Sequence, residues 1–137
     1  MFEDEKDDKI YNLLISKGID KNDEYHKFLE AIYSKSDFLW KESFTTSITT
    51  VNESFFEKID VIIILSGIYN QNKENKEKID GMVKAGKKHD IPIILVRPYG
   101  SEIVPESLEK EAISIVGWNG NCIVTTIKDA INGDLDF

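Results

Sequence analysis

The residues best suited to chemistry follow the apolar run DVIIILSGIY, which extends from Asp60 to Tyr69. Directly after this run the chain is crowded with lysines and acids, and the acids are Glu74, Glu77 and Asp80. A carboxylate beside a ribose can accept a hydroxyl hydrogen bond and stabilise the positive charge that develops as a leaving group departs. The same composition is typical of a solvated helix face held by charge pairs four residues apart, such as Glu74 with Lys78, and the spacing favours that simpler interpretation.

Four aromatic residues fall at or just beyond the ends of expected strands, where a flat nucleotide ring could stack on them. They are Trp40, Tyr69, Tyr99 and Trp118. The alternative is that the two tryptophans pin loops to the core. For Trp118 we favour this structural role, because Gly117 and Asn119 on either side predict a tight turn. In that turn Asn119 would cap the following helix.

Anion and metal chemistry have few candidates in this sequence. Arg97 is the sole arginine, so it alone could hold a phosphate in a bidentate fork; it could equally brace the loop that follows it, together with Glu102. His26 and His89 have no second ligand at metal-binding spacing and are expected at the surface, so no metal site is predicted.

A further acidic pair, Asp20 and Asp23, lies where a receiver domain would hold Mg²⁺. The neighbouring Asn22 makes a helix cap the better interpretation of this pair.

The elements that must position these groups alternate between strands and helices. Short apolar runs rich in β-branched residues predict strands at 10–15, 38–40, 61–65, 91–96 and 113–116, and helical spacing predicts helices at 25–33, 51–59, 79–83, 105–112 and 122–131. Solid apolar strands between helices are typical of a parallel sheet covered on both faces. We therefore expect one flavodoxin-like, three-layer α/β domain with a five-stranded parallel sheet in the order 2-1-3-4-5. The residues expected to be deeply buried are Leu14, Phe55, Ile63, Ile64, Ile94, Leu95 and Ile127.

Composition limits the partners. The chain has 137 residues and a net charge of −8, with many acids in residues 1–8, so nucleic acid would be repelled. We expect residues 1–8 to be an acidic, partly disordered terminus and residues 9–137 to form the domain.

No apolar run is long enough to cross a bilayer, and the start is acidic, so a cytoplasmic protein without membrane contact is predicted. Cys122, the only cysteine, is expected to be a small buried apolar group.

Taken in order, the segments YNLLIS, DFLWKESF, DVIIILSGIY, IPIILVRPYG and AISIVGWNGNCIVTTI resemble the TIR-like domain family of Thoeris antiphage defence proteins. The resemblance extends from about Lys9 to Ile131. It implies a flavodoxin-like fold and a role in bacterial immune signalling. It also implies NAD⁺ cleavage at the nicotinamide bond, release of a cyclised or conjugated ADP-ribose messenger, and homo- or hetero-oligomers with TIR-like or effector proteins.

The chain differs from this family where the chemistry is expected. After the first strand the family tends to show Ser-His-Ser-Trp, whereas here Ser16 is followed by KGI. In the third helix the family's Glu-Ile is matched by Lys78 and Ile79, and Glu77 would point away from the buried face because it lies about 200° around the helix from Ile79. The site assigned from the resemblance has Glu77 and Ser16 as catalytic residues. Its nucleotide-binding residues are Ser16, Trp40, Tyr69, Lys78, Tyr99 and Trp118.

Three functions follow from these residues. The first is a TIR-like defence protein that acts through assembly or partner contacts, with NAD⁺ cleavage weakened or lost and no tightly bound cofactor. The second is an active NAD⁺-cleaving enzyme that uses Glu77, Glu74 or Asp80 as its acid. The third is a flavodoxin-like or receiver-like regulatory domain. The missing His, Trp and Glu favour the first function over the second.

Overall fold

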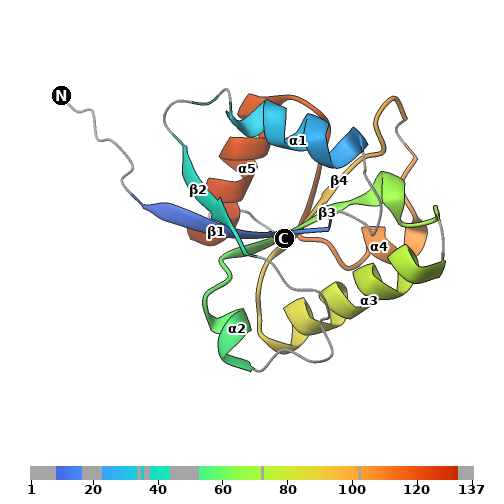
Figure 1. The fold of residues 1–137 in the computed structure, drawn as a ribbon, viewed down its shortest axis with the longest axis horizontal. Helices are drawn as coiled ribbons and strands as arrows, with labels where there is room; N and C mark the ends of the chain where they lie inside the picture. The colour runs from blue at the N-terminus through green and yellow to red at the C-terminus, as the bar shows by residue number, and fades with distance from the viewer. Residues whose placement is uncertain are drawn as a thin grey trace.

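The computed structural model describes residues 9–16, 23–33, 35, 38–43, 53–71, 73–101 and 103–132. It is an α/β structure with a central five-stranded sheet and helices on both faces (Figure 1). In chain order the elements are β1 (Ile10–Ile15), α1 (Asp23–Tyr33), β2 (Leu39–Glu42), α2 (Glu53–Glu57), β3 (Val61–Leu65), the 3₁₀ helix η1 (Ser66–Ile68), α3 (Lys73–Lys88), β4 (Ile93–Val96), α4 (Glu106–Glu109), β5 (Ser114–Val116) and α5 (Gly120–Asn132).

The five strands are all parallel and lie in the order β2-β1-β3-β4-β5, which confirms the predicted topology. The central strand β3 pairs with β1 on one side and β4 on the other, so that Ile63 stands opposite both Ile15 and Ile94. All five residues of β3 are fully buried. A strand covered on both faces has no solvated side, and for this reason it reads as a solid apolar run in the sequence.

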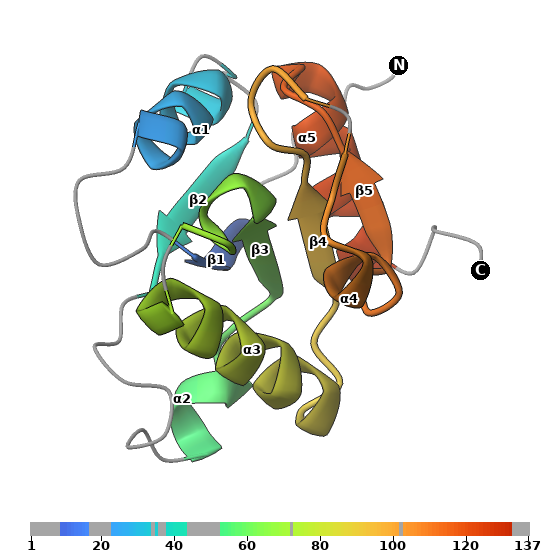
Figure 2. The same cartoon turned by 90° about the vertical axis from the view of Figure 1, so that its right-hand side faces the viewer.

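The helices form two layers, with α1 and α5 on one face of the sheet and α2 and α3 on the other (Figures 1 and 2). Phe28 and Ile32 of α1 are four residues apart and both fully buried, as one face of an amphipathic helix requires. On the other side α3 approaches the sheet at Gly86, where a Cβ atom would come within 3.0 Å of Ile62 and Ile93. A side chain at this position would require Ile62 and Ile93 to move by a few tenths of an ångström.

Most of the residues expected in the core are deeply buried, and two expectations about burial are wrong. In α2 the buried aromatic is Phe56, 5% exposed, whereas Phe55 only packs against the edge of the core. In α5 the Cys122 side chain is exposed and Ile123 takes the buried position. The predicted cap is confirmed, because Oδ1 of Asn119 accepts a 3.0 Å hydrogen bond from the backbone N–H of Cys122.

The two histidines differ in environment. His26 is exposed, as expected, whereas His89 is half-buried and its ring stacks on Phe56 with 4.7 Å between the centroids, so the surface prediction for His89 is wrong. Over the described ranges no three His, Cys, Asp or Glu side chains gather closely enough to hold a metal ion. None of the helices described is long and apolar enough to span a membrane. The acidic residues 1–8, Asp20 and Asn22 lie outside the described residues.

Candidate functional site

The carboxyl ends of the parallel strands meet at one edge of the sheet, which faces the viewer in Figure 2. Two buried serines tie the strand ends together there. The Ser16 hydroxyl accepts a 2.8 Å hydrogen bond from the backbone N–H of Leu65, and the Ser66 hydroxyl donates a 2.6 Å bond to the carbonyl oxygen of Val96. Both side chains are less than 5% exposed. The structure therefore places Ser16 beneath this edge as a link between β1 and β3, and its catalytic and nucleotide-binding roles stay predictions.

One carboxylate at this edge belongs to Glu24, in the first turn of α1. It lies directly against Gly67 of η1, so closely that a Cβ atom at position 67 would overlap it. Oε2 of Glu24 accepts a 3.1 Å hydrogen bond from the backbone N–H of Tyr99. Oε1 is buried and has no hydrogen-bond donor among the described residues. One acid thus joins α1 to the segments that follow β3 and β4, with one oxygen still able to accept a bond.

Tyr99 stands at the same edge and is held from two sides. Its ring meets Trp118 edge to face, with 5.3 Å between the centroids and 72° between the planes. Lys27, on α1, places its Nζ 4.9 Å from the centroid of the Tyr99 ring. The ring is still 56% exposed, so the Tyr99–Trp118 pair offers solvent-facing aromatic surface.

A hollow of about 380 Å³ lies beside this pair. Its lining residues are Arg97, Pro98, Gly100, Ser101, Gly117 and Trp118. The indole N–H of Trp118 donates a 2.8 Å hydrogen bond to the carbonyl oxygen of Arg97, whose own N–H bonds to Val116 at 2.9 Å. The loops after β4 and β5 are therefore fixed to each other, and the indole is fixed at the hollow's wall.

The guanidinium group of Arg97 lies alongside Gly117, with Nη1 4.0 Å from where a Cβ atom would stand. It forms no ion pair with any described residue, so its charge faces the hollow without a carboxylate partner from that part of the chain. Glu102, the partner in the bracing alternative, lies outside the described residues. Of the two predicted roles for Arg97, binding an anion fits the geometry of the hollow.

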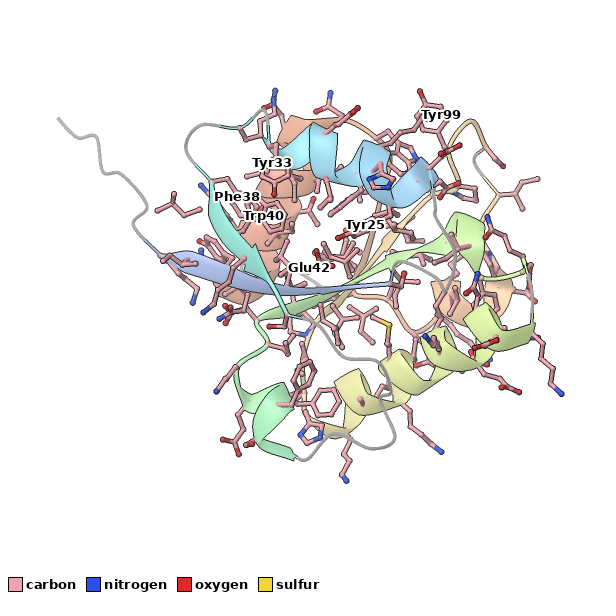
Figure 3. The ribbon with its side chains drawn as sticks, in the orientation of Figure 1. Tyr25, Tyr33, Phe38, Trp40, Glu42 and Tyr99 are labelled. Atoms are coloured by element: carbon pink, nitrogen blue, oxygen red, sulfur yellow. The ribbon has the colours of Figure 1, made fainter. Side chains whose placement is uncertain are left out.

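Trp40 does not share this edge, and the expectation that it does is wrong. It pairs in register with Tyr11, near the start of β1, and its ring lies 5.2 Å from that of Tyr33. Figure 3 shows Trp40 and Tyr33 together at one end of α1 and Tyr99 at the other. The prediction failed because β2 runs from Leu39 to Glu42, two residues beyond the expected strand end, which moves Trp40 into the strand.

Tyr69 is near the carboxyl end of β3, as expected, but it faces inward. Its side chain is 4% exposed, and its hydroxyl donates a 2.6 Å hydrogen bond to Oδ1 of Asp80 and accepts a 3.5 Å bond from Ser107. Burial and the bond to Asp80 raise the pKa of Tyr69 above its usual value, which keeps the phenol neutral. Tyr69 therefore ties η1 to α3 and α4, and Asp80 is occupied by the same contact.

The other candidates on α3 lie on its outer surface. Glu74, Glu77 and Lys78 are all exposed, and none of them lines the hollow beside Trp118. The buried face of α3 carries Asn75 and Ile79 instead, which confirms that Glu77 points away from the core. The structure thus brings Arg97, Tyr99 and Trp118 together and leaves the charged residues of α3 outside.

Sequence reasoning missed two acids. Glu24 stands next to Asp23 at a helix start, where acids are expected for capping alone, so the residue type gave no sign of its contact with Gly67. Glu42 ends β2, and its Oε1 accepts a 2.6 Å hydrogen bond from the Tyr25 hydroxyl beneath α1 (Figure 3). The sequence contained a signal for this second contact. Glu42 follows Trp40 by two residues in the same strand, so both side chains must point to the same face of the sheet, towards α1.

Comparison of the chain with protein-family models and with curated proteins finds no match. Function therefore has to be inferred from the fold and from the side chains at the carboxyl edge of the sheet.

Proposed function

We propose that this chain is a cytoplasmic TIR-like protein of bacterial antiphage immune signalling. It binds an NAD⁺-type nucleotide at the carboxyl edge of its sheet and acts through homo- or hetero-oligomeric contacts with TIR-like or effector proteins, with NAD⁺ cleavage weak or lost. The observation that carries the nucleotide proposal is that the guanidinium of Arg97 and the indole of Trp118 line the same hollow.

Each part of such a ligand has a partner at this edge. Arg97 offers planar N–H donors and a permanent positive charge, the pattern that best recognises a phosphate. Trp118 and Tyr99 offer aromatic surface for a nucleotide ring. The hollow of about 380 Å³ falls in the size range of ligand sites, and ligands of open α/β sheets bind where the strands end.

Weak cleavage is inferred from the acids of α3. Cleavage at the nicotinamide bond builds positive charge on the ribose, which a nearby carboxylate stabilises. Glu77 is exposed on the outer side of α3, and Asp80 is engaged by the Tyr69 hydroxyl. Lys78 occupies the position where the family resemblance expects glutamate, and it too is exposed on α3 and does not line the hollow, so this position offers no carboxylate to the ribose.

The second candidate function is an active NAD⁺-cleaving enzyme, and Glu24 is the observation that favours it. Its carboxylate lies at the carboxyl edge with Oε1 unoccupied by any donor from the described residues. In that case Glu24, and not an acid of α3, would stabilise the charge on the ribose.

Titration calorimetry of the full chain with NAD⁺, and chromatography of the same mixture for free nicotinamide, test these functions. We expect binding without nicotinamide release. Arg97→Ala should weaken binding about tenfold or more, because a charge-assisted bond to phosphate is lost. The matched control is Lys84→Ala, which removes one exposed positive charge from α3 and should leave binding unchanged.

Three results would overturn the proposal. Failure of NAD⁺ to bind the parent protein would exclude the hollow as a nucleotide site. Equally tight binding of NAD⁺ to the parent and to Arg97→Ala would exclude it as well. Sustained nicotinamide release by the parent protein would replace the first function by the second.

A further inference from the structure

Opposite charges both occur at the carboxyl edge of the sheet. Arg97 directly follows β4 and lines the hollow, whereas the Glu24 carboxylate lies against Gly67, which follows β3. Tyr99 connects the two, because it follows Arg97 by two residues and donates its backbone N–H to Glu24. The edge therefore has a cationic side at Arg97 and an anionic side at Glu24, linked through the backbone of Tyr99.

Among the described residues, the Glu24 carboxylate has little compensation of its charge. Oε1 is buried, without a hydrogen-bond donor in the part of the chain described, and the glycine at position 67 leaves no Cβ to hold the carboxylate away. The nearest cation on the same helix, Lys27, lies over the Tyr99 ring, and no ion pair joins it to Glu24. The neighbouring Asp23 is exposed and adds a charge of the same sign. A partly buried charge is screened less than a surface charge, so its field reaches a ligand that need not touch it.

We propose that Glu24 is a specificity-determining residue, which makes the site prefer the cationic nicotinamide ring of NAD⁺ over the neutral dihydronicotinamide ring of NADH. This inference rests on the proposed nucleotide site. The two nucleotides share their phosphates, riboses and adenine, so Arg97 and Trp118 contribute alike to both. The two differ at the nicotinamide ring, which is cationic and aromatic in NAD⁺ and neutral and not aromatic in NADH, and the phosphates, drawn to Arg97, leave that ring free to face the anionic side.

The test compares the dissociation constants of NAD⁺ and NADH by calorimetry at low salt for the full chain. We expect the parent to bind NAD⁺ about fivefold more tightly than NADH or better. Glu24→Gln should bring the ratio towards one, chiefly by weakening NAD⁺. The matched control is Glu30→Gln, an identical substitution at an exposed position six residues further along α1. It separates the local effect of Glu24 from the general field of a chain whose net charge is −8.

Glu24→Asp keeps the charge and should keep most of the preference for NAD⁺. If Glu24→Gln does not fold, Glu24→Ala takes its place, since it removes the same charge, and it should also lower the ratio. An unchanged ratio of the two dissociation constants in Glu24→Gln, or in its replacement, overturns the inference about Glu24. If both nucleotides still bind in a way that depends on Arg97, the proposed function stands. Failure of both nucleotides to bind the parent overturns the proposed function and the inference together.

Discussion

The hydroxyl group of Tyr25 donates a 2.6 Å hydrogen bond to Oε1 of Glu42 and so joins α1 to the last residue of β2. The contact is partly buried. Desolvation, the hydrogen bond and the negative charge of Glu42 all raise the pKa of Tyr25 well above its usual value. The phenol therefore stays neutral and keeps its proton as the donor. This bond is a tether between a helix of one layer and an outer strand of the sheet.

The first prediction removes this tether. Tyr25→Phe should lower the free energy of unfolding by about 1.5 to 3 kcal/mol, because a part-buried carboxylate loses its phenolic donor. Urea unfolding followed by circular dichroism measures the change. Tyr33→Phe, at the other end of α1 and 70% exposed, is the control and should shift stability by no more than about 0.5 kcal/mol. Equal effects of the two substitutions would show that the hydrogen bond adds no stability.

The second prediction concerns pH. The pKa of Tyr25 is higher in the folded chain than the usual 10.0, so the folded state holds this proton more tightly than the unfolded state. The stabilisation is therefore complete below the usual pKa and is lost as pH rises from there towards the folded value. The gap in unfolding free energy between parent and Tyr25→Phe should narrow above about pH 10. A gap that is constant from neutral pH to pH 11 would contradict this assignment.

The third prediction tests the contact between Glu24 and Gly67. Gly67→Ala should destabilise the protein by about 0.5 to 1.5 kcal/mol, because the new methyl group displaces the flexible end of Glu24 from its hydrogen bond with Tyr99. Gly117→Ala is the control, since its nearest neighbour would be Nη1 of Arg97 at 4.0 Å. In a double-mutant cycle, Glu24→Ala should relieve most of the cost of Gly67→Ala. Strictly additive effects would mean that the two residues do not compete for the same space.

The fourth prediction concerns the central strand. Ile64 is 0% exposed between two helical layers, so Ile64→Asp places an unpaired charge where no polar partner exists and should leave the protein insoluble. Leu39→Asp makes the same chemical change at a position that is 46% exposed and should give folded material. Sedimentation of the expressed protein distinguishes the two. Folded, dispersed Ile64→Asp protein would contradict the described core.

The fifth prediction concerns α3. Because Glu77 and Lys78 are exposed and do not line the hollow, Glu77→Ala and Lys78→Glu should each bind NAD⁺ within about twofold of the parent. Nicotinamide release should stay undetectable in Glu77→Ala. Robust release by the parent that vanishes in Glu77→Ala would restore the enzyme interpretation with its acid on α3. Gain of release in Lys78→Glu would instead identify a lapsed catalytic position at residue 78.

The strands were the most predictable part of the fold. The runs IYNLLI and VIIIL coincide with β1 and β3 to the residue, and VIIIL is apolar throughout because β3 is buried on both faces. The bounds of helix α3 were harder to predict from the sequence. It begins at Lys73, whereas apolar spacing indicated a helix only from Ile79, because its first turns are surrounded mostly by water and carry little periodic signal.

The candidate site was only partly predictable. Arg97 and Trp118 follow neighbouring strands directly, so the parallel topology alone brings them to one edge. The position of Glu24 depends on how α1 packs on the sheet, and no local sequence pattern predicts that packing. Phe55 and Phe56 show a related limit, since in a helix of five residues two adjacent aromatics cannot reveal which of them faces the core.

The two tryptophans belong to opposite outer strands of the sheet, because Trp40 lies in β2 and Trp118 follows β5. Trp40, in β2, packs on Tyr33 of α1, whereas Trp118 forms part of the wall of the hollow. Each is therefore a natural fluorophore for a different region of the protein. Trp40→Phe would leave Trp118 as a single intrinsic reporter, whose emission should respond when a ring stacks on its indole. Trp118→Phe would leave Trp40 to report events at β2, so fluorescence alone can separate occupation of the hollow from contacts made at the far side of the sheet.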